Sequence, residues 1–325
     1  MTALESGHHF SNLDLNLDLN LEQILGEVLG RDRPFLEHAN LPWAQIKRAR
    51  YFAHQRFEYV YPSRVRDLSQ RLMVRPPSGY GDQRLLDFKL NVQPGPARRH
   101  ELRDTFGNPV IELEVASIRH GTTFEVMLCT ERETSQKSPR VQASKIERWL
   151  RPTPLTSADN RILEVAGDLQ RQSKAPFELA ERINDWVSNT MTYRSGLTDV
   201  HTTASEALEI GGGLCQDYAH LSLAICRAAG LPARYVSGHM LGEGGSHAWV
   251  EVIVPEGNHL EAVGFDPTNH RRPNLGYTVV ALGRDYADVP PTSGRFIGRH
   301  AGRLHFQKRA GLIELEYHDG HIEQA

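Results

Sequence analysis

Cysteine is scarce in this sequence, which has only Cys129, Cys215 and Cys226 among its 325 residues. An odd and sparse set does not suit a disulfide framework, and no CxxC spacing indicates a structural zinc site. No acidic loop resembles a calcium site either. We therefore expect a reducing, cytoplasmic location in which Cys215 stays a free thiol, and we expect no metal or other cofactor.

Long apolar runs and an excess of positive charge are also missing. The 37 Lys and Arg are outnumbered by 40 Asp and Glu, so no broad basic field is present to hold a nucleic acid. No run reaches the roughly 18 apolar residues that a membrane span needs. The N-terminus has neither a basic start nor an apolar stretch, so we expect no secretory signal. Neither nucleic acid nor a membrane is an expected partner, and the oligomeric state stays open.

The residue pattern changes three times along the chain, and these changes predict four segments. Residues 1–50 contain LDLNLDLNL, which we interpret as a tail although a strand also fits its period of two, and then an amphipathic helix over 21–30. Short β-branched and aromatic stretches between Pro/Gly turns predict a β-sandwich-like domain over 51–134. Residues 135–150 are expected to be a linker, and 151–325 a second domain that includes the C-terminal strands.

Helical spacing followed by β-rich stretches makes this second domain α+β. The expected helices cover 155–171, 175–193 and 215–229, and the expected strands cover 233–240, 247–254 and 260–266. Gly230 should cap the third helix, since a glycine there adopts the left-handed conformation that ends helices.

The stretch GGGLCQDYAH (211–220) places Cys215 at the start of that third helix. Unpaired N–H groups and the helix dipole favour the thiolate there, and the glycines let the backbone turn sharply and approach a substrate. His247 begins the next strand but one, and Asp266 ends the strand after it. Neighbouring strands can bring this imidazole and this carboxylate within hydrogen-bonding reach, which gives the residue set of a Cys-His-Asp triad.

Three blocks of the sequence are similar to the signature blocks of the transglutaminase-like superfamily, in that family's order: GGGLCQDYAHLSLAICRAAGLPARYVSGHM, SHAWVEV and GFDPTN. The resemblance covers roughly 51–315 and is greatest to a bacterial branch described as cysteine proteases. It implies an α+β, papain-like core, with a helix-borne cysteine packed on an antiparallel sheet, preceded by a β-sandwich-like domain. It also implies Cys215 as nucleophile, His247 as general base and acid, and Asp266 as the orienting carboxylate.

Four further residues are candidates for substrate binding. Gln216 could donate to an oxyanion or be a surface side chain, and Trp249 could wall the cleft beside the base or fill the core. Asp285 and Tyr286 lie in a polar loop that could edge the groove, although the residue pattern alone indicates an ordinary turn.

Other polar residues near the triad have simpler explanations. Asp217 in the first helical turn suits the helix dipole better than catalysis. His220 lies on the same helix as Cys215 and is poorly placed to face it. His239 and His270 could line the cleft. Cys129 and Cys226 are expected to be buried.

A triad of this kind predicts attack on a peptide or amide carbonyl and a thioester intermediate. Water would resolve the thioester in a cysteine peptidase or amidase, which we favour, with a peptide or protein as substrate. An amine would resolve it in a transglutaminase that forms isopeptide bonds. A non-catalytic peptide-binding scaffold is the alternative from another class, and the complete Cys-His-Asp set disfavours it.

Overall fold

The computed structural model describes residues 21, 23, 24, 26, 35–134 and 138–325. The LDLNLDLNL segment, most of the helix predicted over 21–30 and the first part of the predicted linker lie outside the described residues. The four described residues of that helix are helical, and Leu21 and Ile24 pack against Phe52 of the first strand.

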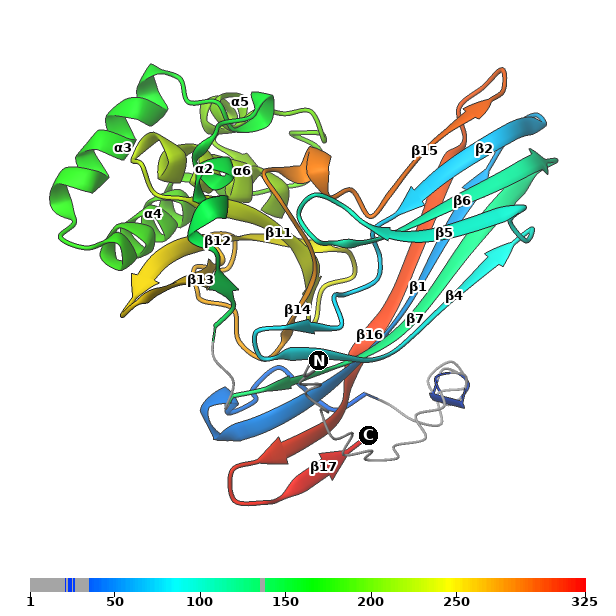
Figure 1. The fold of residues 1–325 in the computed structure, drawn as a ribbon, viewed down its shortest axis with the longest axis horizontal. Coiled ribbons are helices and arrows are strands. Elements are labelled where there is room, and N and C mark those ends of the chain that lie inside the picture. The colour runs from blue at the N-terminus through cyan, green and yellow to red at the C-terminus, as the bar shows by residue number, and fades with distance from the viewer. Residues whose placement is uncertain (1–20, 22, 25, 27–34, 135–137) are drawn as a thin grey trace, which may run out of the picture.

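Two antiparallel sheets form a β-sandwich, drawn on the right of Figure 1. The six-stranded sheet has the order β17-β16-β1-β7-β4-β3, with β17 (Ile322–Gln324), β16 (Arg303–Tyr317), β1 (Ile46–Val60), β7 (Gly121–Glu133), β4 (Gln83–Gln93) and β3 (Gly79–Tyr80). The four-stranded sheet has the order β15-β2-β6-β5, with β15 (Thr292–Ile297), β2 (Val65–Leu72), β6 (Pro109–Ile118) and β5 (Arg98–Arg103). Alternating apolar residues of both sheets fill the space between them, as in other sandwiches.

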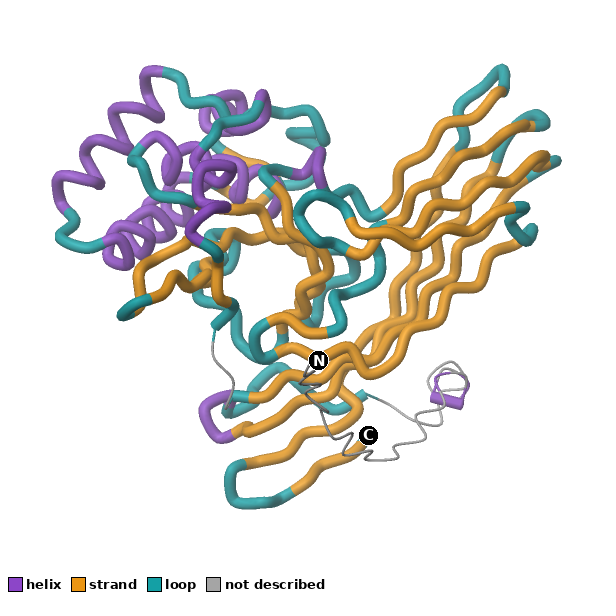
Figure 2. Tube along the Cα trace, viewed as in Figure 1, coloured by secondary structure: helices purple, strands orange, loops and turns teal. Residues whose placement is uncertain are grey.

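The second unit is a helical layer on an antiparallel sheet, purple against orange on the left of Figure 2. The sheet order is β14-β11-β12-β13-β8, with β14 (Tyr277–Gly283), β11 (Ala233–Met240), β12 (His247–Glu256), β13 (His259–Phe265) and β8 (Arg140–Val141). The helices are α2 (Ile146–Leu150), α3 (Asn160–Gln172), α4 (Pro176–Thr190), α5 (Ala204–Ile210) and α6 (Cys215–Ala228). The parallel pair β9 (Thr192–Tyr193) and β10 (Gly212–Gly213) leads into α6, and short 3-10 turns complete the chain: η1 (Trp43–Gln45), η2 (Ala143–Lys145), η3 (Pro154–Thr156) and η4 (Tyr286–Asp288).

Helix α6 is the centre of this unit, and the predicted fold class is confirmed. It packs on the face of β12 that carries Ala248, Val250 and Val252, while α3, α4 and α5 cover its other sides. Gly230 has φ of +71° and ends the helix as predicted. A continuous apolar core therefore fixes the helix whose first residue is Cys215.

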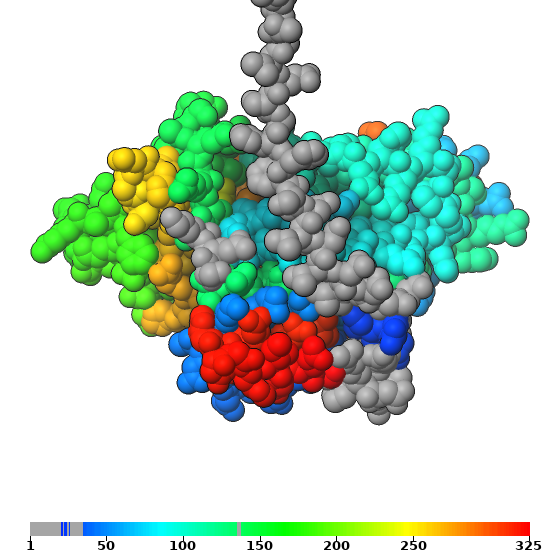
Figure 3. Space-filling model, turned by 60° about the horizontal axis from the view of Figure 1, so that its bottom comes forward, coloured from blue at the N-terminus to red at the C-terminus, as the bar shows by residue number. Residues whose placement is uncertain are grey.

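The strand pairings differ from the predicted domain boundaries at both ends of the second unit. β15 pairs with β2, and β16 pairs with β1 along its whole length, so the C-terminal strands belong to the sandwich. Figure 3 shows the C-terminal residues in red beside the start of β1 in blue. β8, at 140–141, adds a strand to the core sheet within the predicted linker. The α+β core is thus inserted between two parts of one sandwich.

Side chains of the sandwich cover the open edge of strand β14. The Gln83 amide exchanges two hydrogen bonds with the backbone of Val279, at 2.7 and 2.8 Å. The Asn108 amide makes the same pair with Leu282, at 2.7 and 2.8 Å. Because an unpaired buried strand edge is costly, these two amides replace a missing neighbouring strand and fix the core sheet against the sandwich.

Candidate active site

Cys215 is the first residue of α6, and the residues before it shape that helix end. The buried carboxylate of Asp217 accepts the N–H of Leu214 and the hydroxyl of Thr198, both at 2.7 Å. A Cβ at position 213 would lie 2.4 Å from that carboxylate, so only glycine fits there. Gly211 has φ of +72° and ends α5. Gly213 thus serves close packing before the helix, and Gly211 provides the sharp turn that the sequence predicts.

His247 and Asp266 lie within hydrogen-bonding distance of each other, at the ends of adjacent strands. The Nε2 atom of His247 is 2.8 Å from Oδ2 of Asp266, and the two side chains are 3% and 0% exposed. The half-buried thiol of Cys215 lies close enough to His247 to raise the pKa of that imidazole. The structure therefore brings the three predicted residues together at one site.

Asp266 receives several more donors. Its Oδ2 atom accepts the hydroxyl of Tyr277 at 2.7 Å and the amide of Asn269 at 2.8 Å, and its Oδ1 atom accepts the backbone N–H groups of Thr268 and Asn269 at 3.0 and 3.2 Å. Arg271 donates in turn to the Tyr277 hydroxyl at 2.9 Å. This set of donors holds a buried carboxylate in its ionised form, next to the imidazole that it orients.

The electrostatics of the pair follow from these contacts. Burial lowers the pKa of His247, but the hydrogen bonds to Asp266 and Cys215 and the negative charge of both outweigh it and raise that pKa to about 9. Burial raises the pKa of Asp266, but the hydrogen bond and charge of His247, with the donors from Tyr277 and Asn269, lower it overall. Near neutral pH the structure therefore favours an imidazolium on His247 beside a carboxylate on Asp266.

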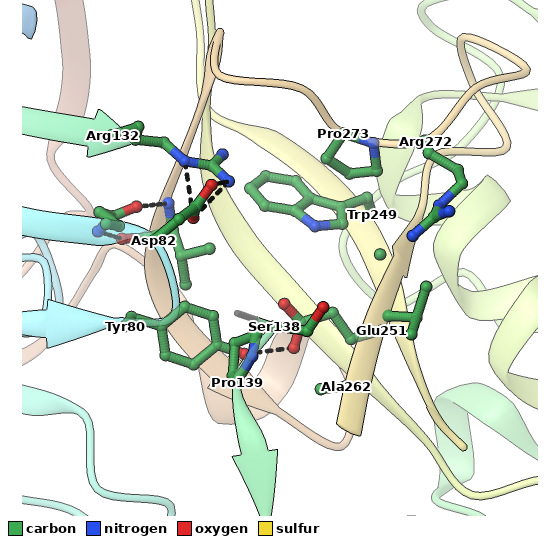
Figure 4. Close-up of a pocket in the computed structure, with 14 residues that line it drawn as sticks. Tyr80, Asp82, Arg132, Ser138, Pro139, Trp249, Glu251, Ala262, Arg272 and Pro273 are labelled. Carbon is green, nitrogen blue, oxygen red and sulfur yellow. Dashed lines mark hydrogen bonds and ion pairs between the residues drawn. The ribbon is translucent and has the colours of Figure 1, made fainter. Parts of the chain in front are cut away.

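Trp249 supports the histidine from behind. It is 1% exposed, stacks on the His247 ring with centroids 6.0 Å apart, and meets Tyr277 edge-on at 5.4 Å. Of the two roles predicted for Trp249, this burial fits core packing behind His247 and not the wall of a substrate cleft. Behind it lies a cavity of about 170 Å³, which Figure 4 shows between Trp249 and Glu251 on one side and Tyr80, Asp82 and Arg132 on the other.

Asp82, Arg132 and Glu251, which line this rear cavity, each have a charged partner. Arg132 binds both carboxylate oxygens of Asp82, at 2.6 and 2.7 Å. Glu251 accepts Nε of Arg234 at 2.9 Å and also the hydroxyl of Tyr80. Of these contacts, the one between Tyr80 and Glu251 joins the sandwich to β12, the strand of His247.

The other three predicted substrate-binding residues lie in different surroundings. The Gln216 amide donates to the Asp199 carbonyl at 3.3 Å, in the loop before α5. Asp285 is 3% exposed, and its carboxylate caps η4 by accepting the N–H of Ala287 at 2.8 Å, so it serves the turn and is not open to a groove. Tyr286 lines a cavity between the two units.

The other histidines considered from the sequence bind partners outside the triad, and the other two cysteines are buried. His220 is fully buried and accepts the N–H of Tyr286 at 3.2 Å, and burial lowers its pKa to about 3. His239 is buried beside Gln55, and exposed His270 pairs with Asp185 at 2.8 Å. Burial raises the pKa of both the Cys129 and the Cys226 thiol to about 12. These two thiols are structural, as predicted.

Sequence reasoning missed Tyr277 and Asn269, although both contact Asp266. Asn269 lies within the GFDPTN block, three residues after the aspartate, a spacing typical of turns that fold back on an Asp side chain. Tyr277 begins β14, and no local spacing links it to Asp266.

Comparisons with known proteins agree with this geometry. Residues 164–262 match the transglutaminase-like superfamily, and residues 51–128 match the bacterial transglutaminase-like N-terminal region. Uncharacterised proteins of Mycobacterium bovis and Mycobacterium tuberculosis are each 32% identical over 279 residues, which cover 75% of this chain and 87% of theirs. A Cytophaga hutchinsonii structure described as "Putative Cysteine Protease" has a TM-score of 0.69 and 22% identity, covering 84% of this chain and 93% of that one.

The fold and the Cys-His-Asp arrangement define the class, and the chain belongs to the transglutaminase-like superfamily, in the bacterial branch with a β-rich N-terminal region. The Cytophaga structure shares the fold of both units. Within the described residues, no helix is long and apolar enough to cross a bilayer.

Proposed function

We propose that this protein is a thiol-dependent hydrolase, a cysteine peptidase or amidase, that acts on a peptide or amide carbonyl. The observation that carries the proposal is the meeting of Cys215, His247 and Asp266 at one site, with His247 hydrogen-bonded to Asp266, because each residue type is the one that a triad requires. Membership of the superfamily supports the same chemistry.

Acylation begins with Cys215 as a thiolate next to the His247 imidazolium. The sulfur attacks the carbonyl carbon, and the backbone N–H groups of Cys215 and Gln216 at the start of α6 face the developing oxyanion, whereas the N–H of Asp217 is bound to the Leu214 carbonyl. When the tetrahedral intermediate collapses, the C–N bond breaks and His247 gives its proton to the leaving amine. A thioester on Cys215 and a neutral imidazole remain.

Deacylation reverses these roles. His247 takes a proton from water, the resulting hydroxide attacks the thioester carbonyl, and the C–S bond breaks to give a carboxylic acid and the thiolate. Asp266 keeps the imidazole in one orientation through both steps and stabilises its charged form. If an amine takes the place of water, the same thioester gives a new amide, as in a transglutaminase.

A mass-spectrometric assay tests the proposal. Wild-type protein and Cys215→Ala are incubated with a diverse peptide pool, with and without a primary amine. We expect new peptide termini or deamidated side chains that only the wild type produces. Glutamines modified by the amine would make the protein an acyltransferase instead. Absence of both products, together with an unreactive Cys215, would overturn enzymatic function and favour a scaffold.

A further inference from the structure

A cavity between the sandwich and the core is lined by residues that flank His247. Its volume is about 390 Å³, within the range of small-ligand sites. Ser246, which lines it, directly precedes His247, and Gly238, also in its lining, pairs with His247 between β11 and β12. Tyr286, also in the lining, donates its N–H to His220 of the helix that begins with Cys215. The cavity is therefore separated from His247 only by residues that flank this histidine in the chain and in the sheet.

One wall of this cavity is an apolar ribbon supplied by the sandwich. Phe57 and Tyr59 of β1 lie on the same face because side chains two apart on a strand point the same way. Leu304 and Phe306 of β16 pair with Tyr59 and Phe57 respectively, and the rings of Phe57 and Phe306 are 4.8 Å apart. The result is a continuous aromatic and aliphatic surface that faces the core.

The β16 half of this ribbon remains open to a ligand, whereas Phe57 of β1 is 4% exposed. Leu304 is 41% exposed and Phe306 is 37% exposed, although both are large and apolar. Exposed apolar clusters next to a catalytic site mark binding surfaces, since covering them with an apolar group releases water.

The cavity contains no formal charge among the described residues that line it. None of them is Asp, Glu, Lys or Arg, and burial holds the pKa of His239 well below its ordinary value, so that imidazole is neutral. Lys308, two residues after Phe306 on the same strand, donates to the carbonyls of Glu243 and Gly245, at 3.0 and 2.8 Å. A charged substrate group would lose its hydration here without gaining a partner.

We propose that this cavity binds a bulky apolar or aromatic side chain of the substrate, close to the carbonyl that Cys215 attacks. The β-sandwich thereby contributes directly to substrate selection, through β1 and β16, and the site exists only when both units are present. The inference rests on the proposed function of Cys215 and adds to it the chemical class of the preferred substrate.

Alkylating probes test the cavity without a known substrate. In each probe the thiolate of Cys215 displaces iodide and forms a C–S bond. The series is iodoacetamide and its N-benzyl, N-phenethyl, N-(3-phenylpropyl) and N-(2-carboxyethyl) derivatives, so that the ring is presented at several distances. The modification rate of Cys215 is measured by mass spectrometry on the full chain. We expect at least one aromatic probe to react about tenfold faster than iodoacetamide, and the anionic probe to react no faster than iodoacetamide.

Matched variants assign the effect to the cavity. Phe306→Ala should reduce the ratio of aromatic to parent rate at least threefold. Phe296→Ala should leave the ratio unchanged, because Phe296 packs on Tyr61 in the sandwich and does not line the cavity. Leu304→Glu should lower the aromatic preference. It should also raise the rate of one further probe, the cationic N-(2-aminoethyl) derivative of iodoacetamide. Misfolding cannot produce such a gain of reactivity.

The outcomes separate the two proposals. Failure of iodoacetamide to modify Cys215 faster than Cys226 would contradict the proposed function itself. Selective modification of Cys215 with equal rates for all probes would leave the triad in place and refute the apolar cavity. An aromatic preference that survives both Phe306→Ala and Leu304→Glu would place the apolar site elsewhere and refute this assignment.

Discussion

The hydroxyl of Tyr277 donates to Oδ2 of Asp266 at 2.7 Å, the same oxygen that lies 2.8 Å from Nε2 of His247. The ring of Tyr277 also meets the His247 ring edge-on, with centroids 5.9 Å apart. One tyrosine thus touches both the base and the carboxylate that orients it. We therefore assign it as a positioning residue for the proposed triad, and Arg271 donates to its hydroxyl from the other side.

Removing that hydroxyl should weaken the triad but keep the fold. A hydrogen bond to a charged group contributes about 1.5–3 kcal/mol, so we expect Tyr277→Phe to lower kcat/KM about tenfold, mainly through kcat. The aromatic ring stays in place, so Tm should change little. Tyr317→Phe is the matched control, since its hydroxyl binds Glu323 at the surface. A large fall in Tm with unchanged kcat would show that Tyr277 acts only in folding.

The raised pKa of His247 can be measured directly. Its value of about 9 means that the imidazole keeps its proton at pH 8, where an ordinary histidine with a pKa near 6.5 is mostly neutral. Nitrogen-15 NMR of histidine-labelled protein, with His247→Gln to assign the signal, should show titration near pH 9. Asp266→Asn removes a negative charge and should lower the pKa. A pKa at or below 6.5 in the wild type would contradict the ion-pair mechanism.

The reactivity of the three thiols provides an independent check. Because burial raises the pKa of Cys129 and Cys226 to about 12, both stay protonated and shielded. Iodoacetamide at mildly acidic pH should therefore modify Cys215 alone in the native protein. Cys215→Ala should abolish activity with little change in Tm, because the residue lies at a helix end. Equal modification of Cys215 and Cys226 would argue for a scaffold without a working triad.

Gly238 allows Trp249 of β12 and Tyr277 of β14 to contact each other behind His247. β11 lies between β12 and β14, and Gly238 on β11 has no side chain to separate Trp249 from Tyr277. A Cβ there would lie 2.1 Å from the Thr278 carbonyl and 2.6 Å from the Trp249 ring. We expect Gly238→Ala to destabilise the protein by about 3 kcal/mol and to reduce activity. Gly244→Ala, in open space in the loop before β12, is the control, and equal stability of the two variants would refute this packing argument.

The residues that could be predicted from sequence are those linked by local patterns. Cys215 begins a helix with a clear apolar period, and His247 and Asp266 follow on the hairpin strands β12 and β13, so short-range spacing was enough to bring them together. Fold class follows from the same patterns. Gly230 as the helix cap is a further example, because a single residue type satisfies that backbone conformation.

What could not be predicted depends on contacts between distant parts of the chain. The pairing of β16 with β1 joins the two ends of the sequence, and strand patterns do not specify partners. Tyr277 reaches Asp266 only because the intervening turn folds back and β14 is held at its place in the sheet. The burial of Trp249 follows from the same arrangement, since alternation gives the face of a strand but not what covers it.

The last prediction concerns the amides that hold β14. Gln83→Ala would leave the N–H and carbonyl of Val279 buried without partners, at a cost of about 1–3 kcal/mol for each group. We expect the free energy of unfolding to fall by about 3 kcal/mol, and activity to fall as well, because β14 carries Tyr277 at its start. Gln172→Ala, on the exposed end of α3, is the control and should change neither quantity. Urea denaturation and peptide hydrolysis of both variants provide the measurement. If Gln83→Ala is as stable and active as Gln172→Ala, then the sandwich does not hold the core sheet through this strand, and its contribution to the site would reduce to the apolar ribbon of β1 and β16.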